Sequence, residues 1–371
     1  MKSVLIFSGA NDRAIIAFCR YAVSRNINFA IVANGNEDLI FLTDYKKYVL
    51  STREKNFLDL DIFIQNANLL KAEFDSNEIF VLPSTEFLNR FLLANANFLN
   101  EQNISFGLCN SELYTMISDK YKFGDLCHSY NINLPKEYVV KPSNFPYVIK
   151  PKTYFNTSLE VNMKPVIIEN IEEENLFFSN NSLEELYFQE YVAGKSIYLL
   201  FYFFKDKTFS VYSQENLIQQ HNGGSMILSK SSNYHLDENL VNQFSNLFIS
   251  EGFNGLVMVE VKCYNGTYYM IEANPRFWGP SQLILDAKMS LFDDFSIDQN
   301  LIENHVSTFD EYQLDIPYFW SGGLVETQKS DSQLMVYDYK KEDYLKEYSN
   351  TIKNEIYLRK DTILIYLKEN T

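Results

Sequence analysis

Late in the chain, four residues have the types needed to hold a metal ion and an anion: Glu260, Glu272, Asn274 and Arg276. Carboxylate and amide oxygens suit a hard cation such as Mg2+, which takes few protein carboxylates together with phosphate oxygens. The arginine beside them suits a phosphate or a carboxylate. Because the neighbouring residues are mainly Val, Met, Tyr and Ile, burying these oxygens unpaired would be costly. The alternative is a surface hairpin whose charged side faces water.

Two predicted strands, 256–264 and 267–273, would position these residues. They are separated by Asn265-Gly266, and this dipeptide between β-forming residues indicates a two-residue hairpin turn. The two glutamates lie on the two arms at similar distances from the turn, so the hairpin can bring them together, although the sequence fixes neither register nor face. Strand alternation puts the asparagine on the same face as the second glutamate.

Composition limits the functions open to this chain. Its 371 residues suffice for two or three domains and a sizeable core. With 32 basic and 48 acidic residues, the formal charge is −16. Binding to nucleic acid or to an anionic membrane needs a basic surface, so we expect neither. An anionic ligand would need local cations and a metal ion.

The cysteines and the first residues indicate a soluble, cytoplasmic protein. None of the four cysteines forms a C-x-x-C pair, so neither a zinc site nor a redox motif is indicated, and buried free thiols are expected. The segment 1–13 has one lysine and a short apolar run, which favours a first strand over a signal peptide. No apolar window reaches the roughly 18 residues of a membrane helix.

The first third of the chain reads as a parallel, doubly wound layer. Strand patterns at 4–7 and 29–32 flank a helical pattern at 12–25. The turn after the first strand has only Gly9, which excludes a G-x-G-x-x-G dinucleotide site, although the helix start there could hold an anionic group of a substrate. Glu86 follows a later strand, so it is either a site residue or an acid at a helix start.

Upstream of the hairpin, residues 111–130 have a helical pattern, and a proline-containing turn then leads to 147–151, YVIKP. Together with the later Glu260 and the Glu-x-Asn-Pro-Arg run from Glu272, this order resembles the ATP-grasp enzymes. That group includes biotin carboxylase, carbamoyl-phosphate synthase and D-alanine–D-alanine ligase. The resemblance favours the metal site over the surface hairpin.

The resemblance implies a role for each matching residue. Lys120 and Lys150 would reach the phosphates of ATP, and Glu260, Glu272 and Asn274 would bind Mg2+, as two ions, with Mn2+ as an alternative. Arg276 and Lys150 would serve in catalysis, where charge develops on the transferred phosphoryl group.

A second motif, 187–196, resembles the strand that binds adenine in this family. The resemblance places the nucleotide against Gln189, Glu190, Tyr191 and Val192, with backbone contacts at Glu190 and Val192. Ser196 stands where many members have a ribose-binding acid, and a hydroxyl makes a weaker hydrogen bond than a carboxylate.

Two loops carry further expectations. The segment 152–158 has no glycine where the family has a Gly- and Ser-rich phosphate loop, so the hydroxyls of Thr157 and Ser158 would substitute for it. The loop 219–225, QQHNGGS, is similar to one near the triphosphate and the acceptor. Within it, His221 is either an exposed loop residue or a residue with a catalytic or acceptor-contacting role.

The fold class expected is α/β plus α+β, an ATP-grasp fold preceded by a Rossmann-like domain. We expect the N-terminal domain at 1–112, the ATP-grasp domain at 113–330 with a lid at 122–192, and a C-terminal extension at 331–371.

The function implied is an ATP-dependent ligase that joins a carboxylate to an amine (or thiol) through an acyl phosphate, releasing ADP and phosphate. Its partners would be small molecules, and a homodimer is compatible with this class. Two alternatives remain open. One is another ATP-grasp reaction, such as that of a carboxylase or kinase, and the other is a nucleotide-binding protein with a degenerate site.

Overall fold

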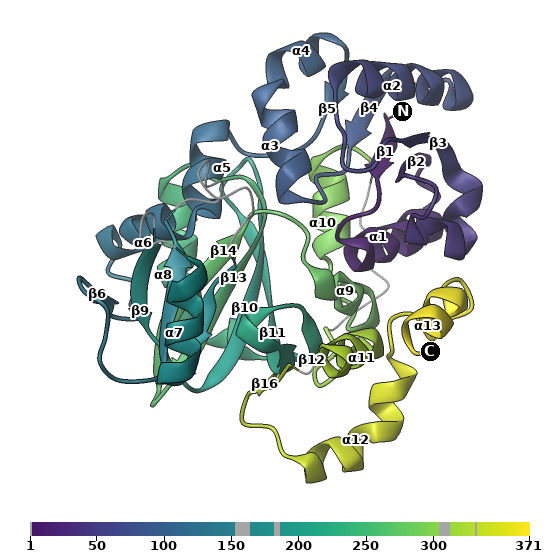
Figure 1. The fold of residues 1–371 in the computed structure, drawn as a ribbon. Helices are drawn as coiled ribbons and strands as arrows, with labels where there is room; N and C mark the ends of the chain where they lie inside the picture. Colours follow the sequence, from purple (N-terminus) through teal and green to yellow (C-terminus); the bar gives the residue numbers. More distant parts are fainter. Residues whose placement is uncertain (1, 153–163, 182–185, 304–311, 331) are drawn as a thin grey trace.

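The computed structural model describes residues 2–152, 164–181, 186–303, 312–330 and 332–371 (Figure 1). Three sheets organise this part of the chain. The N-terminal sheet is parallel, with the strand order β3-β2-β1-β4-β5. Its strands are β1 (Lys2–Phe7), β2 (Phe29–Asn34), β3 (Val49–Arg53), β4 (Glu78–Val81) and β5 (Ile104–Ser105).

Helices cover this sheet, and the apolar strands between them are buried. The helices are α1 (Asp12–Ser24), α2 (Leu60–Phe74), α3 (Glu86–Ala94) and α4 (Ala96–Glu101). Because all five strands are parallel, their carboxyl ends lie on one edge of the sheet. This confirms the predicted Rossmann-like layer.

The residues predicted as one helix at 111–130 form two helices, α5 (Ser111–Ser118) and α6 (Lys120–Ser129). The break lies at Asp119, whose backbone is extended (φ −89°, ψ 111°). The expectation of a continuous helix was therefore wrong. The break makes Lys120 the first residue of a new helix.

A small antiparallel sheet is ordered β6-β9-β7-β8, and with the helix α7 (Ile171–Asn180) it lies within 122–192, the range predicted as a lid. Its strands are β6 (Glu137–Tyr138), β7 (Tyr147–Pro151), β8 (Val166–Ile168) and β9 (Leu186–Glu190). A separate small core of aromatic and aliphatic side chains holds the lid together.

The largest sheet is antiparallel and ordered β14-β13-β10-β11-β12-β15, with β16 also paired to β11. Its strands are β10 (Lys195–Phe203), β11 (Phe209–Gln220), β12 (Met226–Ser232), β13 (Gly255–Tyr264), β14 (Thr267–Asn274), β15 (Pro317–Phe319) and β16 (Leu334–Val336). One face packs on α8 (Glu238–Ser250), α5 and α6, and the other on α1, α9 (Gln282–Asp286) and α10 (Leu291–Asp298).

The chain ends with α11 (Ser321–Lys329), α12 (Lys341–Lys353) and α13 (Ile363–Glu369). Figure 1 shows that α13 returns to the N-terminal domain, near α1. The described residues confirm the predicted mixed fold class, a parallel layer followed by antiparallel sheets.

Candidate active site

The predicted hairpin is present as β13 and β14, joined at Asn265-Gly266. Both turn residues have positive φ, 50° and 77°. A type I′ turn requires this conformation, and asparagine and glycine adopt it most readily. The local sequence therefore determines where the hairpin folds back.

A β-bulge in this hairpin brings the two glutamates together. Near the turn, Val261 pairs with Met270, and the same register would place Glu260 opposite Ile271. Instead the register shifts by one residue, and Glu260 lies directly opposite Glu272. Met270 faces the core under α6 and α8. Without the extra residue, Glu272 would face that core as well, because alternate side chains share a face.

Glu260 is buried, and a chain of hydrogen bonds holds its carboxylate. The Ser196 hydroxyl donates to Glu260 Oε1 at 2.8 Å and accepts from Asn216 Nδ2 at 2.8 Å. Gln214 Nε2 then donates to Asn216 Oδ1 at 2.7 Å. Ser196 is fully buried and bonded to Glu260, where the resemblance had implied a ribose contact. The alternating Gln214 and Asn216 of β11 are the one sequence feature that points to this network, and both are buried.

The other hairpin residues form a connected series. Asn274 Nδ2 donates to Glu272 Oε1 at 2.8 Å, and Arg276 Nη2 donates to Asn274 Oδ1 at 3.3 Å. Arg276 Nε is buried without a hydrogen-bond partner. Lys120 forms an ion pair with Glu272. The hairpin and the start of α6 therefore meet at one point.

Lys150 approaches the same hairpin from the lid. It is 5% exposed, and its Nζ lies 3.5 Å from the carbonyl oxygen of Ile271. Burial and the nearby Lys120 lower the pKa of Lys150 to about 7, whereas Glu260 and Glu137 act in the opposite direction. Burial also lowers the pKa of Lys120 to about 8. A bound anion would stabilise the protonated form of these two desolvated amines.

The predicted adenine segment connects the lid sheet to the large sheet. Gln189 is buried on β9 with its Oε1 unpartnered, and the Glu190 N–H donates to the Lys136 carbonyl at 2.8 Å. Tyr191 is half-buried and Val192 is buried. These residues enter the loop that precedes β10. The predicted Thr157 and Ser158 lie outside the described residues.

A cavity of about 770 Å3 lies in front of the hairpin. Its lining includes Lys120, Glu272, Asn274 and Arg276, the predicted residues nearest the phosphate end. It continues to the loop 223–225 and to the carboxyl ends of the N-terminal strands. Its volume lies in the range of small-molecule sites, which is about 300–1,000 Å3.

His221 and Glu86 differ in their position relative to the cavity. His221 is not among the residues that line the cavity. Glu86 does line it, but its carboxylate accepts hydrogen bonds from Arg90 Nε at 2.7 Å and from the Tyr114 hydroxyl at 2.8 Å. Glu86 therefore supports the start of α3 and the packing of α5.

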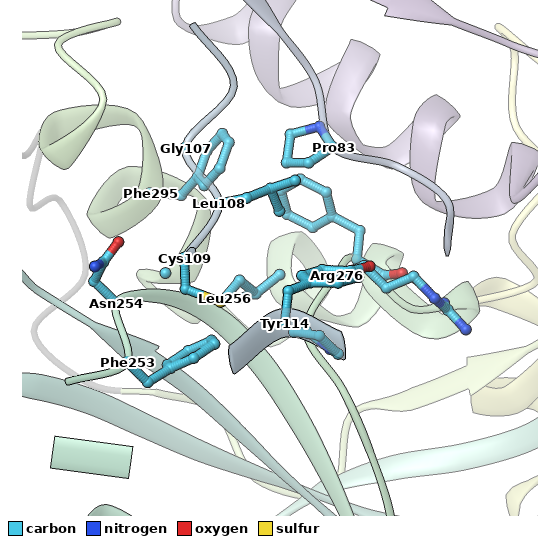
Figure 2. Close-up of a pocket in the computed structure, with 13 residues that line it drawn as sticks. Pro83, Gly107, Leu108, Cys109, Tyr114, Phe253, Asn254, Leu256, Arg276 and Phe295 are labelled. Carbon is cyan, nitrogen blue, oxygen red and sulfur yellow. The ribbon is translucent and has the colours of Figure 1, made fainter. Parts of the chain in front are cut away.

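Figure 2 shows a much smaller pocket on the other side of Arg276. Rings and aliphatic groups line it, including Pro83, Leu108, Tyr114 and Phe253, and the guanidinium of Arg276 points away from it. Its volume is about 10 Å3, enough for about one water molecule. This pocket cannot hold a substrate.

The oxygen ligands of the hairpin fit a hard cation. Glu272 and Asn274 line the large cavity, and Glu260, which is buried opposite Glu272, does not. The described residues contain no cluster of three His, Cys, Asp or Glu residues suited to a metal ion. The hairpin presents two carboxylates and one amide oxygen, which is the small protein share that Mg2+ takes when phosphate oxygens complete its shell.

Comparison with known families identifies the central part of this arrangement. Residues 117–280 match the family model of the ATP-grasp domain. The chain contains an ATP-grasp domain. The match begins just before Lys120 and ends just after Arg276, so it includes both lysines and the hairpin. A comparison with curated proteins found no match.

Solved structures support the ATP-grasp fold over most of the chain. Biotin carboxylase from Campylobacter jejuni has a TM-score of 0.59 at 12% identity, covering 85% of this chain and 74% of that one. The biotin carboxylase domain of Hydrogenobacter thermophilus 2-oxoglutarate carboxylase was solved with MgADP and bicarbonate. It has a TM-score of 0.58 at 14% identity, and the match covers 85% of this chain and 73% of that one. N5-carboxyaminoimidazole ribonucleotide synthetase from Thermus thermophilus has a TM-score of 0.56 at 13% identity, and the match covers 80% of this chain and 77% of that one. Among the described helices, none has the length and apolar character needed to span a membrane.

Proposed function

We propose that this protein is an ATP-dependent ligase that joins a carboxylate to an amine (or thiol). One observation carries the proposal. Lys120 of α6 forms an ion pair with Glu272, and Lys150 of β7 lies beside the Ile271 carbonyl of the same hairpin. Lys120 and Glu272 line the cavity that continues to the carboxyl ends of the N-terminal strands. A triphosphate at Lys120 would therefore share this cavity with a second substrate.

Each residue has a proposed part. Lys120 and Lys150 neutralise the phosphates of ATP, and the segment 189–192 binds the adenine. Glu260, Glu272 and Asn274 would hold Mg2+, which supplies positive charge to the phosphate oxygens when it is bound. Ser196 positions Glu260 and so acts through it.

The proposed reaction has two steps. A carboxylate oxygen of the substrate forms a bond to the γ-phosphorus, and the bond to the bridging β–γ oxygen breaks, which releases ADP. Arg276, whose Nε is unpartnered, would neutralise charge on the transferred group. The amine nitrogen then bonds to the acyl carbon, phosphate leaves with the electron pair, and the amine proton passes to phosphate or solvent.

We also propose the domain division 1–112, 113–330 and 331–371, with the lid at 122–192. The parallel sheet, which ends with β5, supports the first boundary. The last segment extends the large sheet, because β16 pairs with β11.

An oxygen-18 experiment tests the reaction. The protein is screened with Mg-ATP and pools of amino acids for ADP release, and the active acid is then supplied with oxygen-18 in its carboxylate. An acyl phosphate transfers one labelled oxygen to the released phosphate. Unlabelled phosphate, or a stable phosphorylated product, would instead identify carboxylase or kinase chemistry. Carboxylase chemistry is the second candidate, because biotin carboxylases are among the similar structures.

A further inference from the structure

The wall of the cavity opposite the hairpin belongs to the N-terminal domain, outside the matched residues 117–280. It is built at the carboxyl edge of the parallel sheet. Ser8 follows β1, Arg53 ends β3 and Ser84 follows β4, and all three line the cavity. Ligands of open parallel sheets bind at this edge.

Ser84 offers a buried hydroxyl without a partner. It is 1% exposed, and its Oγ makes no hydrogen bond. The backbone at this point is held in place, because Asn11 Nδ2 donates to the Ser84 carbonyl at 2.8 Å and to the Phe277 carbonyl at 3.0 Å. A buried hydroxyl without a partner costs free energy that a ligand oxygen would recover.

Arg53 offers a cation without a carboxylate partner among the described residues. Its Nη atoms donate to the carbonyls of Ser8 (3.2 Å), Glu54 (3.4 Å) and Phe57 (3.2 Å), and its Nε is buried and unpartnered. Asp38 acts on its charge but accepts its own hydrogen bonds elsewhere, including one from the Ser8 hydroxyl at 2.6 Å. The carbonyls therefore fix the guanidinium, and no carboxylate among the described residues forms a hydrogen bond with it.

Two acids beside this wall are already engaged. Asp12 accepts from the N–H of Gly9 at 3.1 Å and does not line the cavity. Glu86 is bonded to Arg90 and to Tyr114. Neither carboxylate forms a hydrogen bond with the Arg53 guanidinium. An incoming anion would therefore meet hydrogen-bond donors at this wall.

We propose that Arg53 and Ser84 form an oxyanion subsite for the substrate other than ATP. The subsite selects a small acid that carries a second anionic group, a carboxylate or a phosphate ester, remote from its reacting group. The reacting group and its position rest on the proposed function. The subsite itself rests on the cavity and on two groups without a hydrogen-bond partner, Ser84 Oγ and Arg53 Nε.

The test measures anion binding without ATP, so that it does not depend on ligase activity. Succinate and inorganic phosphate are titrated by calorimetry into the wild type, Arg53→Gln, Ser84→Ala and the control Lys55→Gln. Lys55 is exposed and does not line the cavity, so its variant removes the same charge two residues away. Losing a charged hydrogen bond predicts a Kd about 10- to 100-fold weaker for Arg53→Gln, and losing a neutral one predicts about 2- to 10-fold for Ser84→Ala.

The results separate the two anion sources and the two proposals. Tighter binding of succinate identifies a carboxylate, and tighter binding of phosphate identifies a phosphate ester. With an acid that supports ADP release, Arg53→Gln should raise the KM for that acid at least about tenfold and leave the KM for ATP unchanged. Equal binding by wild type and Arg53→Gln, or an equal loss in Lys55→Gln, overturns the subsite. Absence of ADP release with intact anion binding overturns only the ligase.

Discussion

At the scale of single residues, the sequence predicts which side chains belong to the site better than it predicts the hydrogen bonds that hold them. The glutamates, the asparagine and the arginine of the hairpin could be chosen by type and spacing. The bonds from Ser196 to Glu260 and from Asn216 to Ser196 could not, because they cross three strands. Their existence depends on the register between strands, which is set by packing and not by local sequence.

The charge of Lys150 should make Mg-ATP binding depend on pH. With a pKa of about 7, it loses its charge as the pH rises, and anionic phosphates favour the protonated amine. Mg-ATP binding near pH 8 should therefore take up protons, and the affinity should fall between about pH 6.5 and 8.5. Calorimetry in buffers of different ionisation enthalpy measures this uptake. Lys150→Arg should remove this residue's share of the uptake, because arginine stays charged.

The stability of the ligand-free protein should change in the opposite direction. The folded protein binds fewer protons at Lys150 than the unfolded chain, whose lysine has the ordinary pKa of 10.5. The free energy of unfolding should therefore rise as the pH increases from about 7 to about 10.5. Chemical denaturation across this range checks the sign, and a fall in the Lys150 contribution, obtained by difference from Lys150→Arg, would contradict it.

At the scale of elements, turn and strand signals were sufficient for the hairpin, but its bulge was not foreseen. Ile271 is the extra residue of the bulge, and its type does not distinguish it from its strand neighbours. The bulge is needed because Met270 packs on one face of the sheet and Glu272 lies on the other. The break at Asp119 was missed for a similar reason. Helical periodicity continues through it, while the start of α6 is fixed by contacts with β14.

Gly194 joins the proposed adenine segment, 189–192, to β10 with φ +114°, and an added Cβ would lie 2.2 Å from the carbonyl oxygen of Cys263. Gly194→Ala should lower the free energy of unfolding by more than about 2 kcal/mol and weaken Mg-ATP binding. The control is Gly252→Ala, where φ is also positive (+71°) but nothing lies within 4 Å.

Gly252→Ala should cost only the backbone strain, about 1–2 kcal/mol, and should leave Mg-ATP binding unchanged. Urea denaturation and calorimetry of both variants check the pair. Equal losses of stability and of affinity would show that the approach of Gly194 to Cys263 does not position the adenine segment.

At the scale of the whole molecule, Arg20 joins α1 to the C-terminal segment 356–362 and to α9. Arg20 of α1 donates to Asp361 at 2.8 Å, to the Ile356 carbonyl at 3.0 Å, to Thr362 at 2.8 Å and to Gln282 at 2.7 Å. The sequence indicated a C-terminal segment but not this attachment, because its partners are separated by more than 250 residues. The attachment steadies the cavity wall that α1 helps to form.

Arg20→Gln tests this attachment. Removing a partly buried charge that serves several acceptors should lower the free energy of unfolding by about 2–4 kcal/mol. The exposed pair of Lys346 with Asp343 is the matched control, and Lys346→Gln should change stability by less than about 0.5 kcal/mol. Denaturant titration of both variants gives the comparison. Equal, small changes would show that the C-terminal attachment does not stabilise the fold.

The most direct test of the whole account is Mg-ATP binding and ADP release by Glu272→Gln, beside the exposed control Glu101→Gln. Glu272→Gln keeps the shape of the side chain but removes a carboxylate that faces Glu260 and Lys120. We expect at least about a hundred-fold loss of ADP release, and no change in the control. Undiminished Mg-dependent ATP binding and ADP release by Glu272→Gln would show that this hairpin does not hold the metal and the nucleotide.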